Sequence, residues 1–108
     1  MRAVIKKPGE SPEIIDVDND LKPLQEAVGG YIEHFSLTRG IGILCDEDGR
    51  FKGPVVDGRV TSLPYTFAFD EYVVFVGAVL FVGESGDDFT DLTDEQVDLI
   101  NRSFEGIL

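Results

Sequence analysis

The alternation of apolar and polar residues predicts a series of short β-strands separated by turns rich in glycine, proline and aspartate. Residues 2–7 and 13–17 carry β-branched side chains, and residues 8–12 between them, Pro-Gly-Glu-Ser-Pro, have strong turn chemistry. These segments predict an N-terminal β-hairpin. Further strands are expected at residues 31–37 and 41–45, where apolar residues with strand propensity recur.

The longest apolar run, residues 72–82, predicts a strand buried on both faces, or two strands that meet in a bend at Gly77. Its length is too short for a helix that crosses a bilayer, which takes about 20 residues. The chain before this run predicts a turn, a short strand, a loop and an edge strand, in that order: residues 46–49, around Phe51, residues 53–64 and residues 65–69.

The first of two predicted helices is short, about two turns, and follows the capping residues at 18–20. Leu21, Leu24 and Val28 recur at helical spacing. Gly29 and the glycine after it are expected to end this helix, because glycine readily adopts the left-handed conformation of a helix C-cap.

The second predicted helix lies near the C-terminal end of the chain, after a tight acidic loop that is expected to follow Gly83. Thr93 is a suitable N-cap and Gln96 follows three residues later, which is the spacing of a capping box. Val97, Ile100 and Phe104 form one apolar stripe. This stripe predicts that the helix packs on a sheet.

Together these elements predict an α+β fold. We expect a mostly antiparallel sheet of about four to six short strands, covered on one face by the C-terminal helix, with the second, short helix at one end of the sheet. A chain of 108 residues is long enough for one core, so residues 1–108 are expected to form a single globular domain.

The cysteine content and the N-terminal sequence favour a cytoplasmic protein. Cys45 is the single cysteine, so the chain cannot form an intramolecular disulfide or supply a zinc site built from several cysteines. The first residues lack the apolar stretch of a signal peptide. We therefore expect a cytoplasmic protein that does not associate with the membrane.

The net charge of −12 narrows the range of partners. Residues 1–59 hold 11 acidic and 8 basic residues, whereas residues 60–108 hold 10 acidic residues and Arg102 as the one base. A field of this sign repels phosphates and disfavours direct nucleic-acid binding. It attracts a basic protein surface, or it serves only to keep a small domain soluble.

Few side chains offer recognisable chemistry. His34 and Cys45 are the one candidate base and thiol nucleophile, but Cys45 shares an apolar strand face with Ile41 and Ile43, as a small core residue does. The Asp-x-Asp-x-Asp spacing at residues 16–20 lacks the later glycine and glutamate of a calcium loop. We therefore expect no catalytic residue, no metal site and no cofactor.

Several short motifs resemble, in their order and spacing along about residues 1–100, the phage- and mobile-element-associated family labelled domain of unknown function 3846. The motifs that carry the resemblance follow the N-terminal hairpin with its Pro-Gly pair: residues 28–33 (VGGYIE), 43–49 (ILCDEDG), 77–83 (GAVLFVG) and 88–96 (DFTDLTDEQ). The family often has a Leu-Pro-x-Asn-Arg-like segment after the acidic turn, and the corresponding residues 53–59 lack the asparagine. The resemblance implies a bacterial or phage cytoplasmic setting and brings no established activity.

Three functions remain open at this point. The first is a non-enzymatic accessory protein of phage or mobile-element origin that binds a host protein or a small molecule through Tyr31, Glu33, Asp87, Asp88 and Phe89. The second is an acidic DNA mimic that inhibits a nucleic-acid-binding enzyme, and the third is an enzyme of unrecognised type. The oligomeric state is not specified by any residue pattern.

Overall fold

The computed structural model describes residues 1–7, 9–37, 39–46, 60–62, 74–76 and 78–105. Strands and helices follow one another along these residues in an order that begins with a hairpin and ends with a helix. The elements are β1 (Arg2–Lys6), β2 (Glu13–Asp16), α1 (Leu21–Val28), β3 (Ile32–Ser36), β4 (Ile41–Asp46), β5 (Val60–Ser62), β6 (Val74–Val76), β7 (Val79–Ser85), β8 (Asp88–Thr90) and α2 (Asp94–Ser103).

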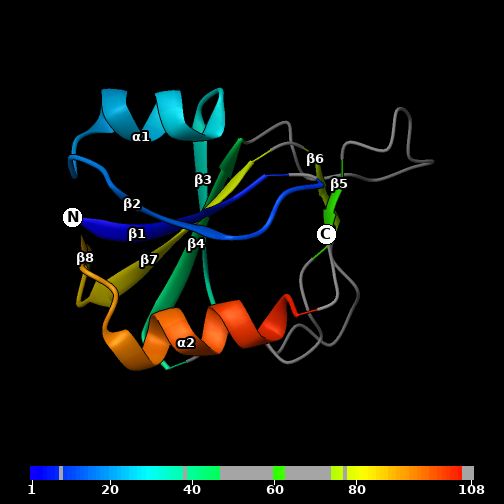
Figure 1. Ribbon diagram of the computed structural model, residues 1–108. Helices are drawn as coiled ribbons and strands as arrows, with labels where there is room; N and C mark the ends of the chain where they lie inside the picture. The colour runs from blue at the N-terminus through cyan, green and yellow to red at the C-terminus, as the bar shows by residue number, and fades with distance from the viewer. Residues whose placement is uncertain (8, 38, 47–59, 63–73, 77, 106–108) are drawn as a thin grey trace.

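The main sheet has the strand order β2-β1-β7-β4-β3, and β8 also pairs with β7 (Figure 1). Every pairing in it is antiparallel. One edge of β7 pairs along its length with β4, while β1 and β8 share the opposite edge, β1 at the start of β7 and β8 at its end. The structure confirms the predicted α+β class, the antiparallel sheet and the N-terminal hairpin.

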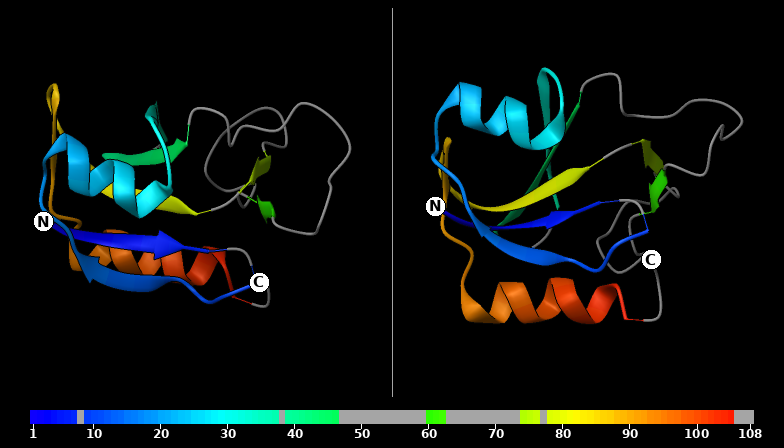
Figure 2. Two further views of the ribbon diagram at one scale, coloured as in Figure 1. Left: turned by 90° about the horizontal axis from the view of Figure 1, so that it is seen from above. Right: turned by 45° about the horizontal axis from the view of Figure 1, so that its top comes forward.

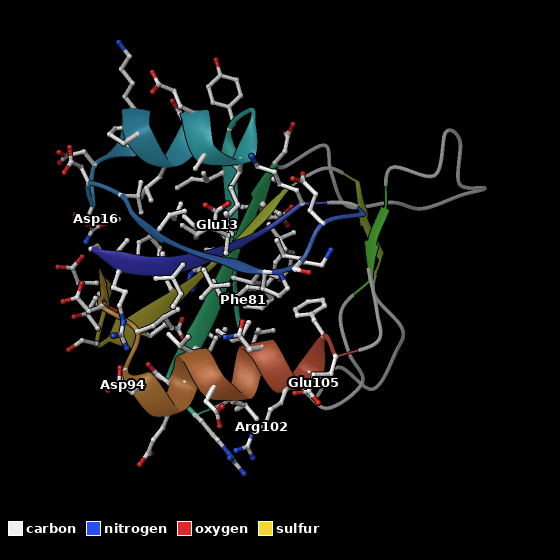
Figure 3. All side chains as sticks on the ribbon, viewed as in Figure 1. Glu13, Asp16, Phe81, Asp94, Arg102 and Glu105 are labelled. Atoms are coloured by element: carbon white, nitrogen blue, oxygen red, sulfur yellow. The ribbon has the colours of Figure 1, made fainter. Side chains whose placement is uncertain are left out.

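Side chains alternate between the two faces along each strand, so the buried strands present apolar side chains to both faces. One helix covers each face. The face that packs on α2 carries Val4, Ile43 and Phe81, and Phe81 is labelled between the strands and α2 in Figure 3. The ring of Phe81 meets that of Phe104 edge to face, with centres 5.9 Å apart. The opposite face packs on Leu24 of α1, and the sheet lies between the two helices in Figure 1 and in the right panel of Figure 2. The expectation that the short helix lies at one end of the sheet is therefore wrong.

The long apolar run is divided between two sheets. β6 pairs with β5 in a separate two-stranded sheet, whereas β7 begins at Val79 in the main sheet. This matches the predicted division of the run into two strands, although Gly77 itself lies outside the described residues. β7 is buried on both faces, since Leu80 packs toward α1 and Phe81 toward α2, and neither is exposed to solvent.

The capping box predicted for α2 is present. Gln96 N donates to Thr93 Oγ1 at 3.1 Å, and Thr93 N donates to Gln96 Oε1 at 2.9 Å. The Gln96 side-chain amide also donates to the carbonyl of Arg39 at 2.8 Å, which joins the helix to the β3–β4 turn. Val97, Ile100 and the C-cap Phe104 are buried, as their spacing predicts.

Helix α1 ends as predicted and begins without a side-chain cap. Gly29 is the C-cap with φ 86°, in the left-handed region that favours glycine. Asp20 is the N-cap residue but its side chain caps no backbone N–H. Leu24 and Val28 are buried, whereas Leu21, the first residue of the helix, is 62% exposed. Neither helix in the described ranges has the length and apolarity needed to cross a membrane.

Two strands lie where loops are expected. β5 forms at Val60–Ser62, inside the predicted loop at residues 53–64, because its residues pair with β6. β8 forms in the acidic segment after Gly83, because it pairs with the end of β7. Other predicted minor elements lie wholly or partly outside the described residues: the turn at 46–49, the strand around Phe51, the rest of the loop at 53–64 and the edge strand at 65–69.

One charged side chain is buried in the described part of the core. Lys6 is 1% exposed, its ammonium donates to the carbonyl of Lys7 at 2.7 Å, and it lies 5.5 Å from the centre of the Phe104 ring. Burial lowers the pKa of Lys6, because the charged form loses its hydration there.

Candidate functional site

A hollow of about 280 Å³ opens beside β3, on the face of the sheet that also carries α1. We call it the β3–β8 pocket. Its walls come from one edge strand and from the β7–β8 hairpin, which are far apart in the chain. The lining residues are His34, Ser36, Glu84, Gly86, Asp87, Asp88 and Phe89.

A shared carboxylate joins the two walls of the β3–β8 pocket. Glu84 Oε2 accepts a hydrogen bond from His34 Nε2 at 2.6 Å and another from Ser36 Oγ at 2.7 Å. His34 and Ser36 are two residues apart on β3 and so share a face. Glu84 reaches the same face from β7 across β4, where Ser36 pairs with Gly42 and Gly42 pairs with Val82.

Gly42 gives these three side chains the room to meet. A Cβ added to this residue would lie 2.9 Å from His34 Nε2 and 3.0 Å from Glu84 Oε2. Any larger residue would therefore push the imidazole or the carboxylate away. Because Gly42 has no side chain, the His34–Glu84 hydrogen bond can form directly over the backbone of β4.

The hairpin that supplies the second wall is held by a tight turn and by a side chain from the α1 connection. Gly86 has φ 61° at the first position of a two-residue loop, a conformation that favours glycine. Asn19 Nδ2 donates to Asp88 Oδ1 at 3.2 Å and to the carbonyl of Phe89 at 3.0 Å. The Phe89 ring meets the His34 ring edge to face, with centres 5.0 Å apart.

Three of the five predicted binding residues lie in this pocket: Asp87, Asp88 and Phe89. Tyr31 is 70% exposed and lines a different hollow of about 460 Å³, at the C-terminal end of α1. Glu33 alternates with His34 on β3 and so faces the other side of the sheet, where it pairs with Cys45 in register. The predicted set is therefore divided between separate places on the fold.

The sequence prediction did not include His34, Ser36 and Glu84 among the binding residues. Part of the signal was present, because the spacing of His34 and Ser36 places both on one face of a strand, and Glu84 ends the apolar run of β7. The missing information was the strand order. Only the placement of β4 between β3 and β7 brings Glu84 to the two β3 side chains.

The arrangement differs from a nucleophile–base–acid relay. In such a relay the histidine accepts the proton of the hydroxyl, whereas here both Ser36 and His34 direct their bonds to the same oxygen of Glu84. Cys45 is buried and lies on the other face of the sheet from His34. Among the described residues, no three His, Cys, Asp or Glu side chains are arranged to hold a metal ion. The two hydrogen bonds instead hold the Glu84 carboxylate in one orientation beside His34 and Ser36.

A comparison with protein-family models finds one match, the family described as Domain of unknown function (DUF3846), over residues 1–105. The comparison with curated proteins finds no match, and neither does the comparison with solved structures. The match covers nearly the whole chain, including every residue that lines the β3–β8 pocket.

Proposed function

The chain belongs to the Domain of unknown function (DUF3846) family, and we propose that it is a non-enzymatic accessory protein that binds a partner group in the β3–β8 pocket. The observation that carries this proposal is the convergence of polar side chains from β3, β7 and β8 on one hollow beside an aromatic ring. Pockets that recognise ligands combine an apolar wall with a few oriented polar groups.

The fixed geometry of Glu84 supports binding over catalysis. Two hydrogen bonds of 2.6 and 2.7 Å hold one carboxylate oxygen, so the side chain is oriented before any ligand arrives. Pre-oriented groups strengthen binding because less conformational freedom is lost on association. Ser36 donates to the same carboxylate oxygen as His34 and not to the imidazole, which supports recognition over a Ser-His relay.

The proposed setting is the cytoplasm of a bacterium that carries a phage or mobile element. This part of the proposal is supported by the resemblance of the sequence motifs to such proteins and by the single cysteine. The partner is then a host protein or a small molecule.

A thermal-shift panel of metabolites and short peptides tests the binding proposal. A ligand at about 100 times its Kd stabilises the folded state by ~2.7 kcal/mol, which raises the Tm of a domain of this size by on the order of 10 °C. The variant Ser36→Tyr fills the pocket and should lose the shift, whereas Glu95→Gln, on α2 and outside this pocket, should keep it. A panel in which no compound gives a shift that depends on the pocket would overturn the proposal.

A second candidate, DNA mimicry, is favoured by the acidic residues that gather around Arg2. The backbone N–H of Arg2 donates to Asp91 at 2.7 Å, its guanidinium lies 2.8 Å from Asp94, and Asp16 is its partner in the sheet register. Asp16 and Asp94 lie at the same end of the molecule in Figure 3. Mimicry predicts inhibition of a DNA-binding enzyme that weakens as salt rises, and inhibition that salt does not change would contradict it.

A further inference from the structure

We propose that the β3–β8 pocket receives a cationic nitrogen group, a guanidinium or an alkylammonium, between the carboxylates of Glu84 and Asp87 and beside the Phe89 ring. This inference rests on the binding function proposed above and adds the charge and hydrogen-bonding character of the ligand. Three observations support it: the carboxylate oxygens that accept no hydrogen bond from the described residues, the negative charge of the lining residues, and the pocket volume of about 280 Å³.

Two carboxylates keep acceptor capacity for a ligand. Glu84 Oε2 is occupied by His34 and Ser36, while Oε1 accepts no hydrogen bond within the described part of the chain. The Glu84 side chain is 19% exposed, so it meets solvent through the pocket. Asp87, at the tip of the hairpin, makes no hydrogen bond or ion pair with the described residues. Free carboxylate oxygens are acceptors, and they select a ligand that donates.

The charge of the lining selects a positive donor. Glu84, Asp87 and Asp88 line the pocket, and none of the lining residues that the structure describes is lysine or arginine. A phosphate or carboxylate ligand would meet like charges here, whereas an N–H⁺ donor forms charge-assisted hydrogen bonds, which are about twice as strong as neutral ones. A metal ion is disfavoured because the described carboxylates and imidazole do not converge in a ligand geometry.

The aromatic wall and the volume point to an organic cation of small size. Phe89 offers its ring beside the carboxylates, and a cation within about 6 Å of an aromatic centre is attracted by the ring. The hollow of about 280 Å³ lies at the lower end of the range for ligand pockets, which is about 300–1,000 Å³. It therefore suits one basic side chain or one small amine.

Two sources can supply this chemistry: an arginine or lysine side chain of a partner protein, or a free amine or guanidine metabolite. Both present the same group to the pocket. The two sources are separated by comparing a peptide with a free compound.

The test is a titration followed by ¹H–¹⁵N NMR of the intact chain at physiological salt. The probes are n-butylguanidinium, n-butylammonium, the neutral analogue n-butylurea, the anion butyrate, and a short blocked peptide with a central arginine. We expect saturable shifts of the backbone amides of Ser36, Gly86, Asp87 and Phe89 with the guanidinium and the ammonium, and not with butylurea or butyrate.

Two charge-removing variants give the matched comparison. Asp87→Asn should weaken guanidinium binding about tenfold, because it removes one charge-assisted bond. Asp98→Asn, on α2 across the sheet, removes the same charge and should leave the affinity unchanged. Since Asp87 is exposed and makes no hydrogen bond or ion pair with the described residues, its variant should fold normally.

The outcomes separate this inference from the binding function itself. If butylurea or butyrate binds in the pocket as well as the cations do, the cation inference is wrong and the binding function stands. If cations shift only amides outside the pocket, the inference is also wrong. If no probe of any charge and no peptide shifts a pocket amide, both proposals lose their support. A peptide that binds at least tenfold more tightly than butylguanidinium supports a protein source, and equal affinities support a metabolite.

Discussion

Gly42 and Gly83 lie on neighbouring strands of the sheet, and replacing each with alanine should have very different effects. A Cβ at Gly42 would meet the ends of two side chains, His34 Nε2 at 2.9 Å and Glu84 Oε2 at 3.0 Å. A Cβ at Gly83 would meet backbone, the carbonyl oxygens of Asp91 at 2.6 Å and Thr90 at 2.9 Å. Side-chain ends can rotate away, whereas the backbone of β8 cannot move without breaking its pairing with β7.

The expected cost of Gly42→Ala is small. Displacing the two side chains loses hydrogen bonds that contribute about 0.5–1.5 kcal/mol each. Alanine in place of glycine also stabilises the folded protein by about 0.4–1 kcal/mol, because it lowers the conformational entropy of the unfolded chain. The free energy of unfolding should therefore fall by about 0–2.6 kcal/mol if both bonds to Glu84 are lost, and the His34–Glu84 hydrogen bond should be lost.

The expected cost of Gly83→Ala is larger. The added Cβ must separate β8 from β7 at the Gly83–Thr90 pair, and it strains Leu92, whose N–H donates to the carbonyl of Arg2 at 2.9 Å. Overpacking alone costs about 1–3 kcal/mol, and the lost pairing adds to it, so we expect a loss of about 3 kcal/mol or more.

Urea unfolding followed by circular dichroism measures both losses. With a slope of about 1–3 kcal/mol per molar urea, a difference of about 2 kcal/mol should place the midpoint of Gly83→Ala about 0.7–2 M below that of Gly42→Ala. The imidazole ¹⁵N shifts of His34 should change in folded Gly42→Ala, as its hydrogen bond is lost. If Gly83→Ala is no less stable than Gly42→Ala, the β7–β8 register argued here is refuted.

Three further predictions concern the packing of the domain. Ile100→Ala should lower the free energy of unfolding by about 2–5 kcal/mol, because Ile100 is fully buried between α2 and the sheet. Leu21→Ala, at an exposed site, should change it by less than about 0.5 kcal/mol. Urea unfolding measures both changes. Thr93→Ala should cost about 1 kcal/mol through the lost capping box, measured as a lower Tm. Burial lowers the pKa of Lys6, so the unfolded chain binds more protons than the folded one between the folded pKa and the ordinary value of 10.5. The free energy of unfolding should therefore rise with pH across that window. Lys6→Met should abolish the rise, and an unchanged pH profile in this variant would contradict the argument.

Local sequence signals predicted much of the fold because their physics is local. The capping box depends on residues three apart, so Thr93 and Gln96 could be recognised directly. Gly29 ends α1 for a reason that is equally local, its left-handed backbone. The hairpin of β1 and β2 and the burial of β7 on both faces also follow from short stretches of residues.

Long-range pairing explains what the sequence did not predict. The face occupied by α1 depends on how its connection to β2 crosses the sheet, and no short motif encodes that path. β8 lies in a segment that its composition predicts to be an acidic loop, because aspartate is depleted in strands, although the Gly-Asp pair before it is a known hairpin signal. Glu84 could not be placed beside His34 without the strand order.

A crystal structure of the protein grown with n-butylguanidinium tests the central claim most directly. The account predicts a planar cation in the β3–β8 pocket, within hydrogen-bonding distance of Glu84 Oε1 and the Asp87 carboxylate, with its alkyl chain against Phe89. An empty pocket at a saturating concentration, or a Glu84 side chain that does not meet His34 and Ser36, would contradict it.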